Sequence, residues 1–442
     1  MLPALRFALV SITAVLLSFG LTYGLCLALG VNASPAILAA ALTVRLVRED
    51  SLPAPHTLLG EFLTLPVVVA AAGLVGLAFL KLPVLGAALF TAGITLSILL
   101  RRHGESGRAL GRVIALPLIA VLVMPPVHLE GAHGPLVLPL LVIAAGLIAL
   151  AAALSVSWLA LRLGLMTPPA AHRPTPVPAT RPGTLHITTR MGLQMCAALT
   201  LAFLIGMIFF PAHWFWIVLT AFIVCSGSVG RGDAVYKGLL RLAGAIGGVC
   251  VAALAAYLVF PDPAAYAAAL FSVLFLGIWL RQLNYAWWPA CTTLIFALLQ
   301  GGHADGVAPL LAMRLVCIVI GALCGIAAVW FICPVRTGQL VKKQVAEALA
   351  ALRAYMTEDE AGEGRRAVLE HHAERLERIA APLRLHRRLF GARQPERHLA
   401  TWIELMHRLL AEASSADHDR TALGAGMSRL GAMLKADSEA GT

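Results

Sequence analysis

Charged residues are scarce in this chain, and their scarcity bounds its class. Asp, Glu, Lys and Arg make up 13% of the 442 residues and hydrophobic residues make up 59%, whereas about a quarter of an ordinary soluble domain is charged. The charges are concentrated after Pro334, and a long apolar region broken by short polar turns precedes it. This pattern excludes an ordinary soluble domain and predicts an all-α, polytopic membrane protein.

Motifs of nucleotide binding and catalysis are also missing. The chain has no Walker A motif, no Gly-x-Gly-x-x-Gly motif after a predicted strand, no His-Glu-x-x-His motif and no nucleophile elbow. We therefore expect neither ATP-driven transport nor an enzyme, and no cofactor. The eight cysteines form no Cys-x-x-Cys pair, so we expect reduced, buried thiols and no metal site. The excess of Lys and Arg is typical of cytoplasmic loops and does not indicate a nucleic-acid surface.

Apolar runs predict about twelve transmembrane helices in two groups of six. The first half (residues 1–165) has runs at 5–29, 34–47, 57–80, 83–100, 113–124 and 136–161. The second half (186–334) has runs near 186–210, 214–229, 238–260, 264–280, 285–300 and 309–333. The first run is too long for the apolar region of a signal peptide, and its start holds only one positive charge, Arg6. Between the halves, residues 166–185 contain six prolines and predict an extended cytoplasmic linker.

The two halves resemble each other in order. Residues 5–9, 86–91 and 139–141 match residues 189–193, 267–272 and 309–311. Because six spans per half is an even number, we expect two parallel six-helix repeats related by an axis along the membrane normal. Basic residues gather in alternate loops, such as Arg101 and Arg102, while Lys81 is the basic residue of the short outer loops. This bias predicts that both termini are cytoplasmic.

Residues 335–442 differ in composition from the rest. Apolar residues recur at helical spacing among many charges, for example at Val345, Leu349 and Leu352, which predicts a small cytoplasmic helical domain. Its charges are most simply a solvated face, with attraction to anionic lipid head groups as the alternative.

Charged residues at membrane depth are the first candidates for function, since burying a charge in a bilayer costs several kcal/mol. Glu61 lies within a predicted span and could exchange a proton, or it could pair with Arg45 or Arg48 at the interface. Arg241 occupies the corresponding point of the second half. Arg314 could hold an anionic substrate, or its side chain could extend to the outer surface.

Neutral residues near these charges have plainer alternatives. Thr220, Thr292 and Thr293 could offer hydroxyls to a substrate, although most such groups bond back to their own helix. Tyr285, with the tryptophans that follow it, fits an interfacial aromatic belt or a lining for aromatic ligands. We expect the glycines at 244, 247, 248, 321 and 325 to let helices pack closely.

Four elements of the second half resemble the fusaric acid resistance protein family, which includes aromatic acid exporters of Gram-negative inner membranes. They are Trp216-x-x-x-Thr220-x-x-x-Val224, Arg241-x-x-Gly244 with Gly247 and Gly248, Tyr285-Ala-Trp-Trp with Thr292, and Arg314 with Gly321. The resemblance covers about residues 186–334. Residues 1–165 lack the Arg-x-x-Gly and Tyr-Ala-Trp elements and are connected to it only by the repeat.

The resemblance implies a multi-pass secondary transporter that exports small, often aromatic, carboxylic acids with the proton gradient. Partners would be the organic acid, the lipid bilayer, and a periplasmic adaptor with an outer-membrane channel; a homo-oligomer is a further expectation. Arg241, Arg314, Tyr285, Trp216, Thr220 and Thr292 would contact substrate, and Glu61 would exchange the proton. The alternatives are a passive organic-anion channel and a membrane-anchored protein whose C-terminal domain binds a partner.

Overall fold

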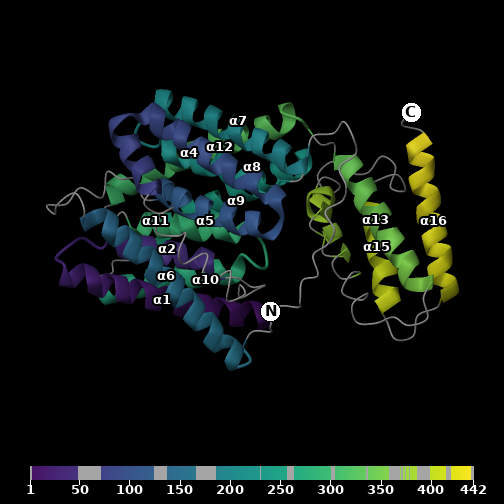
Figure 1. The fold of residues 1–442 in the computed structure, drawn as a ribbon, viewed down its shortest axis with the longest axis horizontal. Coiled ribbons are helices and arrows are strands. Elements are labelled where there is room, and N and C mark those ends of the chain that lie inside the picture. Colours follow the sequence, from purple (N-terminus) through teal and green to yellow (C-terminus); the bar gives the residue numbers. More distant parts are fainter. Residues whose placement is uncertain are drawn as a thin grey trace. The chain divides into compact units, whose positions relative to one another are not determined.

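The structure is a computed structural model, and its described residues are all in helices or in the turns between them (Figure 1). It describes residues 2–47, 71–123, 137–165, 186–228, 230–255, 263–299, 304–334, 337–357, parts of 369–385, 399–414 and 420–439. The chain divides into two compact units. The first comprises Met1–Gly227 and Lys237–Ile332, and the second comprises Ser228–Tyr236 and Cys333–Thr442.

The helices of the first unit are mostly apolar and differ in length, from 12 residues in α8 to 28 in α12. They include α1 (Leu2–Ala28), α2 (Ser34–Leu46), α4 (Pro83–Leu99), α5 (Gly104–Val123), α6 (Val137–Arg162), α7 (Ile187–Phe209), α8 (Trp214–Cys225), α9 (Arg231–Ala255), α10 (Pro263–Leu280), α11 (Trp287–Leu299) and α12 (Ala304–Phe331). A further short apolar helix, Ala71–Lys81, precedes α4. The first residues of α9 belong to the second unit. A 3-10 turn, η1 (Leu100–His103), joins α4 to α5.

Within the described residues, six helices are long and apolar enough to cross a membrane: Ala4–Ala28, Pro83–His103, Leu140–Arg162, Ile187–Phe209, Arg231–Leu254 and Leu311–Phe331. Others are shorter, and α8, with 12 residues, rises about 18 Å against a hydrocarbon core of about 30 Å. The multi-pass membrane class is thus supported, while twelve full crossings in two parallel repeats stays a prediction.

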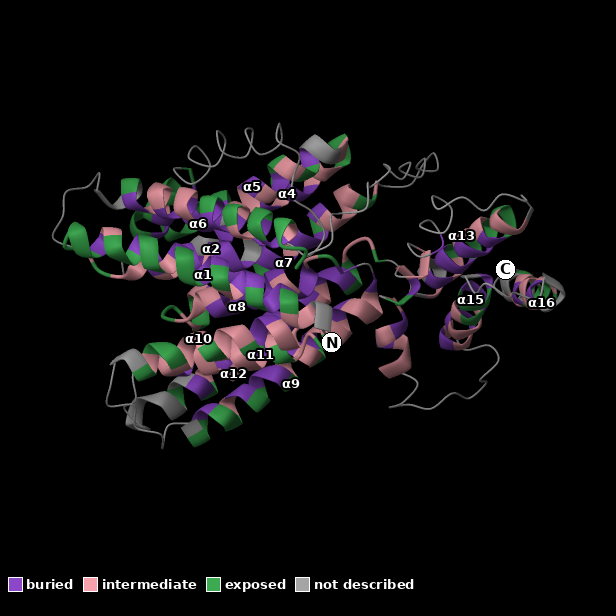
Figure 2. Cartoon of the chain, turned by 90° about the horizontal axis from the view of Figure 1, so that it is seen from below, coloured by how far each residue is buried: buried purple, intermediate pink, exposed green. Residues whose placement is uncertain are grey.

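The outer surface of the first unit is apolar, as a lipid-facing surface must be. Phe331 is 83% exposed and Phe209 is 70% exposed. Buried residues gather around α2, α7 and α8, whereas α1 presents exposed residues along one side (Figure 2). An exposed apolar surface of this extent would be an aggregation liability in water, so the packing itself indicates a bilayer environment.

Both halves of the membrane region contribute to one core. Phe79 lies before α4, and its ring centroid is 4.8 Å from that of Trp214, at the start of α8, with the two rings tilted against each other. Phe90 of α4 meets Phe203 of α7 edge to face, with ring centroids 5.7 Å apart. Ile278 of α10 joins a buried cluster formed by α1, α2 and α6. These contacts fix the second half, which carries the candidate site, against the first.

The second unit is a set of amphipathic helices. It contains α13 (Thr337–Thr357), α15 (Leu399–Ser414), α16 (Arg420–Glu439) and helical residues between 369 and 385. Val345, Leu349 and Leu352 of the apolar stripe are buried with Trp402 in its core. Charged side chains occupy the faces that the core leaves outside, as helical periodicity requires.

Candidate anion site in the membrane unit

The short helix α8 positions the first pair of candidate residues. It ends at Cys225, where Ser226 is extended and Gly227 adopts a left-handed conformation with φ of 66°. A glycine adopts this conformation at little cost, and it lets the chain turn back into α9. The Lys237 ammonium donates to the Ser226 carbonyl at 3.4 Å. The helical hairpin expected from the sequence is therefore present.

Arg241 of α9 points back to α8 within this hairpin. Its side chain is 5% exposed, and its Nε–H donates to Thr220 Oγ1 at 3.3 Å. Thr220 is completely buried. The sequence singled out both residues, and the structure brings them into contact across 21 positions of chain.

Arg314 of α12 lies in a similar setting. Its side chain is 4% exposed, and its Nε–H donates to Thr293 Oγ1 of α11 at 3.4 Å. Its Cζ lies 4.3 Å from the ring centroid of Phe296 and 5.3 Å from that of Trp216. An extension of the Arg314 side chain to the outer surface, one of the two sequence-based alternatives, is contradicted by this burial. Two aromatic faces attract the guanidinium and hold it inside.

The two guanidinium groups are buried without a carboxylate among the described residues. Neither Arg241 nor Arg314 forms an ion pair with a described residue. Both contact α8, Arg241 at Thr220 and Arg314 at Trp216, which lie about one helical turn apart. A buried charge is costly unless it is paired. In the described contacts, each arginine donates a hydrogen bond only from its Nε–H. The N–H groups of its two terminal nitrogens are therefore available to bind an anion.

Several buried polar atoms in this half have no hydrogen-bond partner among the described residues, and two of them belong to predicted site residues. The indole Nε1 of Trp216, whose ring lies against Arg314, is buried without a hydrogen-bond partner, and so is the phenolic oxygen of Tyr285. Buried polar groups normally have a partner. An oxygen-rich ligand would satisfy the Trp216 N–H as well as the guanidinium beside it.

Glycines bring the four helices of the site together. A β-carbon at Gly248 of α9 would lie 2.5 Å from the Ala290 carbonyl oxygen on α11, and one at Gly321 of α12 would overlap the Ile217 carbonyl oxygen on α8. The expected packing role is confirmed for these glycines. A β-carbon at Gly247 would meet nothing within 4 Å, so the prediction is wrong for that residue.

Other predicted residues lie differently. The hydroxyl of Thr292 bonds the Pro289 carbonyl at 3.1 Å, and it is the neighbouring Thr293 that contacts Arg314. Phe296, one turn further along α11, was not predicted. No described contact joins Tyr285 to either arginine. Glu61 lies outside the described residues.

The cysteines do not form a second site. All eight are free. Four are buried, three are half-buried and Cys250 is exposed, so the expectation of burial holds for only half of them. At the others, the apolar helix surface suits a thiol as well as the interior does. In the part of the chain that the structure describes, no group of three His, Cys, Asp or Glu side chains could hold a metal ion.

Comparison with known proteins places the second half of the membrane unit. No curated protein and no solved structure matches the chain. Residues 196–328, which contain both arginines, both threonines and the packing glycines, match the family described as fusaric acid resistance protein-like, so the family predicted from these residues is confirmed over this segment.

Proposed function

We propose that this protein is a secondary transporter of the bacterial inner membrane that exports small aromatic carboxylic acids with the proton gradient. The family match and the apolar helices support a membrane transporter-like role. The observation that carries the substrate class is the burial of Arg241 and Arg314 with only threonines as described hydrogen-bond partners. Two buried cations make a strong anion site.

The surroundings of Arg314 favour an aromatic acid. A carboxylate can accept two parallel hydrogen bonds from the terminal nitrogens of a guanidinium. The rings of Phe296 and Trp216 flank this group and offer apolar surface for a planar ligand. Substrate would enter from the cytoplasm near Arg241 and Tyr285, with the termini on that side.

Proton coupling is assigned to Glu61. The described residues of the first unit place no carboxylate beside the arginines. Glu61, the acid that the sequence places within the predicted span at 57–80, is the group that we propose exchanges the proton. Export through the outer membrane would use a periplasmic adaptor and an outer-membrane channel, as the resemblance implies.

Transport of labelled aromatic acids by the purified full chain in proteoliposomes, with and without a pH gradient, tests the proposal. We expect a gradient-dependent flux that falls at least about tenfold in Arg241→Gln, the loss of one charge-assisted hydrogen bond at about 1.5–3 kcal/mol. The control is Arg162→Gln at the end of α6, where the guanidinium lies on the Trp158 ring 4.3 Å away. Unchanged flux in Arg241→Gln at normal expression would sink the proposal.

A passive organic-anion channel is the second candidate. It is favoured by one observation: the described residues bring positive groups together in the core but no carboxylate that could carry a proton. Flux that follows membrane voltage and ignores a proton uncoupler at clamped voltage would select the channel. Flux abolished by the uncoupler at the same voltage would select the transporter.

A further inference from the structure

The two hairpins of the site follow one numbering offset. α8 begins at Trp214 and α11 at Trp287, 73 residues apart. α9 begins at Arg231 and α12 at Ala304, again 73 residues apart. Two helix starts with the same offset suggest that one hairpin is a copy of the other.

The contacts obey the same offset. The Arg241–Thr220 hydrogen bond of 3.3 Å and the Arg314–Thr293 hydrogen bond of 3.4 Å join residues that correspond pair by pair. The close packing does so as well: a β-carbon at Gly248 would lie 2.9 Å from Thr293 Cβ, and one at Gly321 would lie 2.7 Å from Thr220 Cβ. Each hairpin thus packs its long helix on the short helix of the other.

Helix directions fix the kind of symmetry. Along α12, Gly321 meets Thr220 and Gly325 meets Val224. Both contacts advance together, so α12 runs parallel to α8.

The other pair behaves in the same way. Along α9, Gly244 meets Ala286 just before α11, and Gly248 meets Ala290 within it, so α9 runs parallel to α11. Within the first hairpin α9 runs back along α8, because Lys237 bonds Ser226 while Arg241 bonds Thr220. The exchange that maps α8 onto α11 therefore reverses helix direction, and its axis lies across the helices, in the membrane plane. This is an inverted-topology repeat, the arrangement in which transporters place substrate at the repeat interface.

The two copies differ at the aromatic residues. Trp216 and Phe296 flank Arg314, and the offset places Pro289 and Ile223 at the equivalent positions of the other copy. Neither of these has an aromatic face. In the described contacts, the Arg314 guanidinium therefore lies against two aromatic rings. The Arg241 guanidinium has a threonine partner and no aromatic ring against it.

We propose that the inverted repeat of α8–α9 and α11–α12 builds one anion site with two guanidinium positions, and that its preferred ligand is an aromatic dianion. One carboxylate would bind Arg314, with the ring near Trp216 and Phe296, and the second acidic group would bind Arg241. A monoanion leaves one buried guanidinium without a counter-charge, which is costly, whereas two linked carboxylates bind as one ligand. The proposal rests on the proposed transport of aromatic acids and narrows their class.

Equilibrium binding to the purified full chain in detergent at neutral pH tests this. The probes are benzoate and the three benzenedicarboxylates, whose carboxylates are separated by increasing distances around one ring. We expect at least one dicarboxylate to bind at least tenfold more tightly than benzoate, and the preferred isomer reports the spacing of the two guanidinium groups. In both Arg241→Gln and Arg314→Gln the ratio of dicarboxylate to benzoate affinity should fall to near one, while Arg162→Gln should keep it.

Each possible result bears on either the two-position site or the proposed function. If no dicarboxylate binds more tightly than benzoate to the unaltered chain, or if the advantage survives Arg241→Gln, the two-position site is wrong. If benzoate is bound and exported without such an advantage, only this inference fails, whereas absence of binding and export of every acid refutes the proposed function as well. Should the glutamine variants fail to fold, Arg241→Lys keeps the charge and must retain a dicarboxylate advantage, and its loss there would also overturn the proposal.

Discussion

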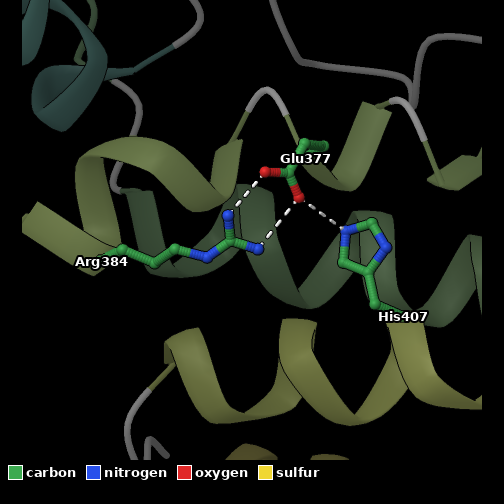
Figure 3. Close-up of polar contacts among 3 residues, drawn as sticks. All are labelled: Glu377, Arg384 and His407. Carbon is green, nitrogen blue, oxygen red and sulfur yellow. Dashed lines mark hydrogen bonds and ion pairs between the residues drawn. The ribbon is translucent and has the colours of Figure 1, made fainter.

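The charged side chains of the two units differ in burial and in their partners. In the membrane unit, Arg241 and Arg314 are buried, and their described hydrogen-bond partners are threonine hydroxyls. In the second unit, Glu377 accepts two hydrogen bonds from Arg384, at 2.6 and 3.0 Å, and lies 3.2 Å from His407 (Figure 3). Both Glu377 and Arg384 are more than one-third exposed.

The contrast separates a structural charge from a functional one. An exposed ion pair contributes about 0–1 kcal/mol and needs no further partner. A buried guanidinium without a carboxylate destabilises the folded protein, and a bound anion would offset this cost. Such a loss of stability in favour of activity is common at functional sites. The membrane unit therefore has the properties of a binding site, and the Glu377 cluster has those of a surface network.

The sharpest test of this comparison replaces one arginine in each unit by a residue of similar length. Without ligand, Arg314→Met should raise the free energy of unfolding by about 2–3 kcal/mol, the cost of a cation at membrane depth, and should abolish transport. Arg384→Met should lower stability by less than about 1 kcal/mol and leave transport unchanged. Thermal midpoints in detergent and flux in proteoliposomes measure both quantities.

A less stable Arg314→Met variant would contradict the idea that this charge strains the fold. It would mean that a carboxylate beyond the described residues, with Glu61 as the first candidate, neutralises Arg314 in the resting protein. Loss of transport in Arg384→Met would show that the second unit takes part in the transport cycle.

A smaller effect is expected at the threonine that supports Arg314. Thr293→Val should remove the acceptor of the Nε–H at 3.4 Å, at a cost of about 1 kcal/mol, and should raise the apparent KM for an aromatic acid about fivefold. Its neighbour Thr292 bonds only the Pro289 carbonyl in the described contacts, so Thr292→Val is the matched control and should transport normally. If Thr293→Val and Thr292→Val changed the apparent KM equally, the assignment of Thr293 as the residue that supports Arg314 would be wrong.

The sequence predicted the helical membrane class, the hairpin at 214–248 and the family, because apolar runs and small-residue spacing are local signals. It also singled out Arg241, Arg314, Trp216 and Thr220. It did not decide whether Arg314 reaches the surface, since that depends on Phe296, a residue of another helix.

The choice between Thr292 and Thr293 was missed for a related reason. Adjacent helix positions point about 100° apart, and only packing decides which one faces a partner helix. A signal was nevertheless present, because within residues 186–334 a Thr followed by an Arg 21 positions later occurs twice, at 220 with 241 and at 293 with 314. This shorter repeat lies within the second half and is distinct from the expected repeat of the two whole halves.

The smallest predicted effect is a pH dependence in the second unit. Hydrogen bonds from Arg384 lower the pKa of Glu377. Partial burial opposes this shift, while the charges of Arg384 and His407 add to it. Glu404 also interacts electrostatically with Arg384. A lowered folded-state pKa contributes stability that is present above the ordinary carboxyl pKa and is lost as pH falls through the lower value. Glu377→Gln should therefore be slightly less stable than the unaltered chain at pH 7, by less than about 1 kcal/mol, and the difference should vanish in acid.

Urea midpoints from pulse proteolysis of the full chain, read on peptides covering Leu399–Ser414, measure this difference in stability, with Arg384→Gln as the matched partner variant. A difference that grows on acidification would show that Glu377 is stabilising in its protonated form, and the second unit would then resemble the membrane unit in its treatment of charge.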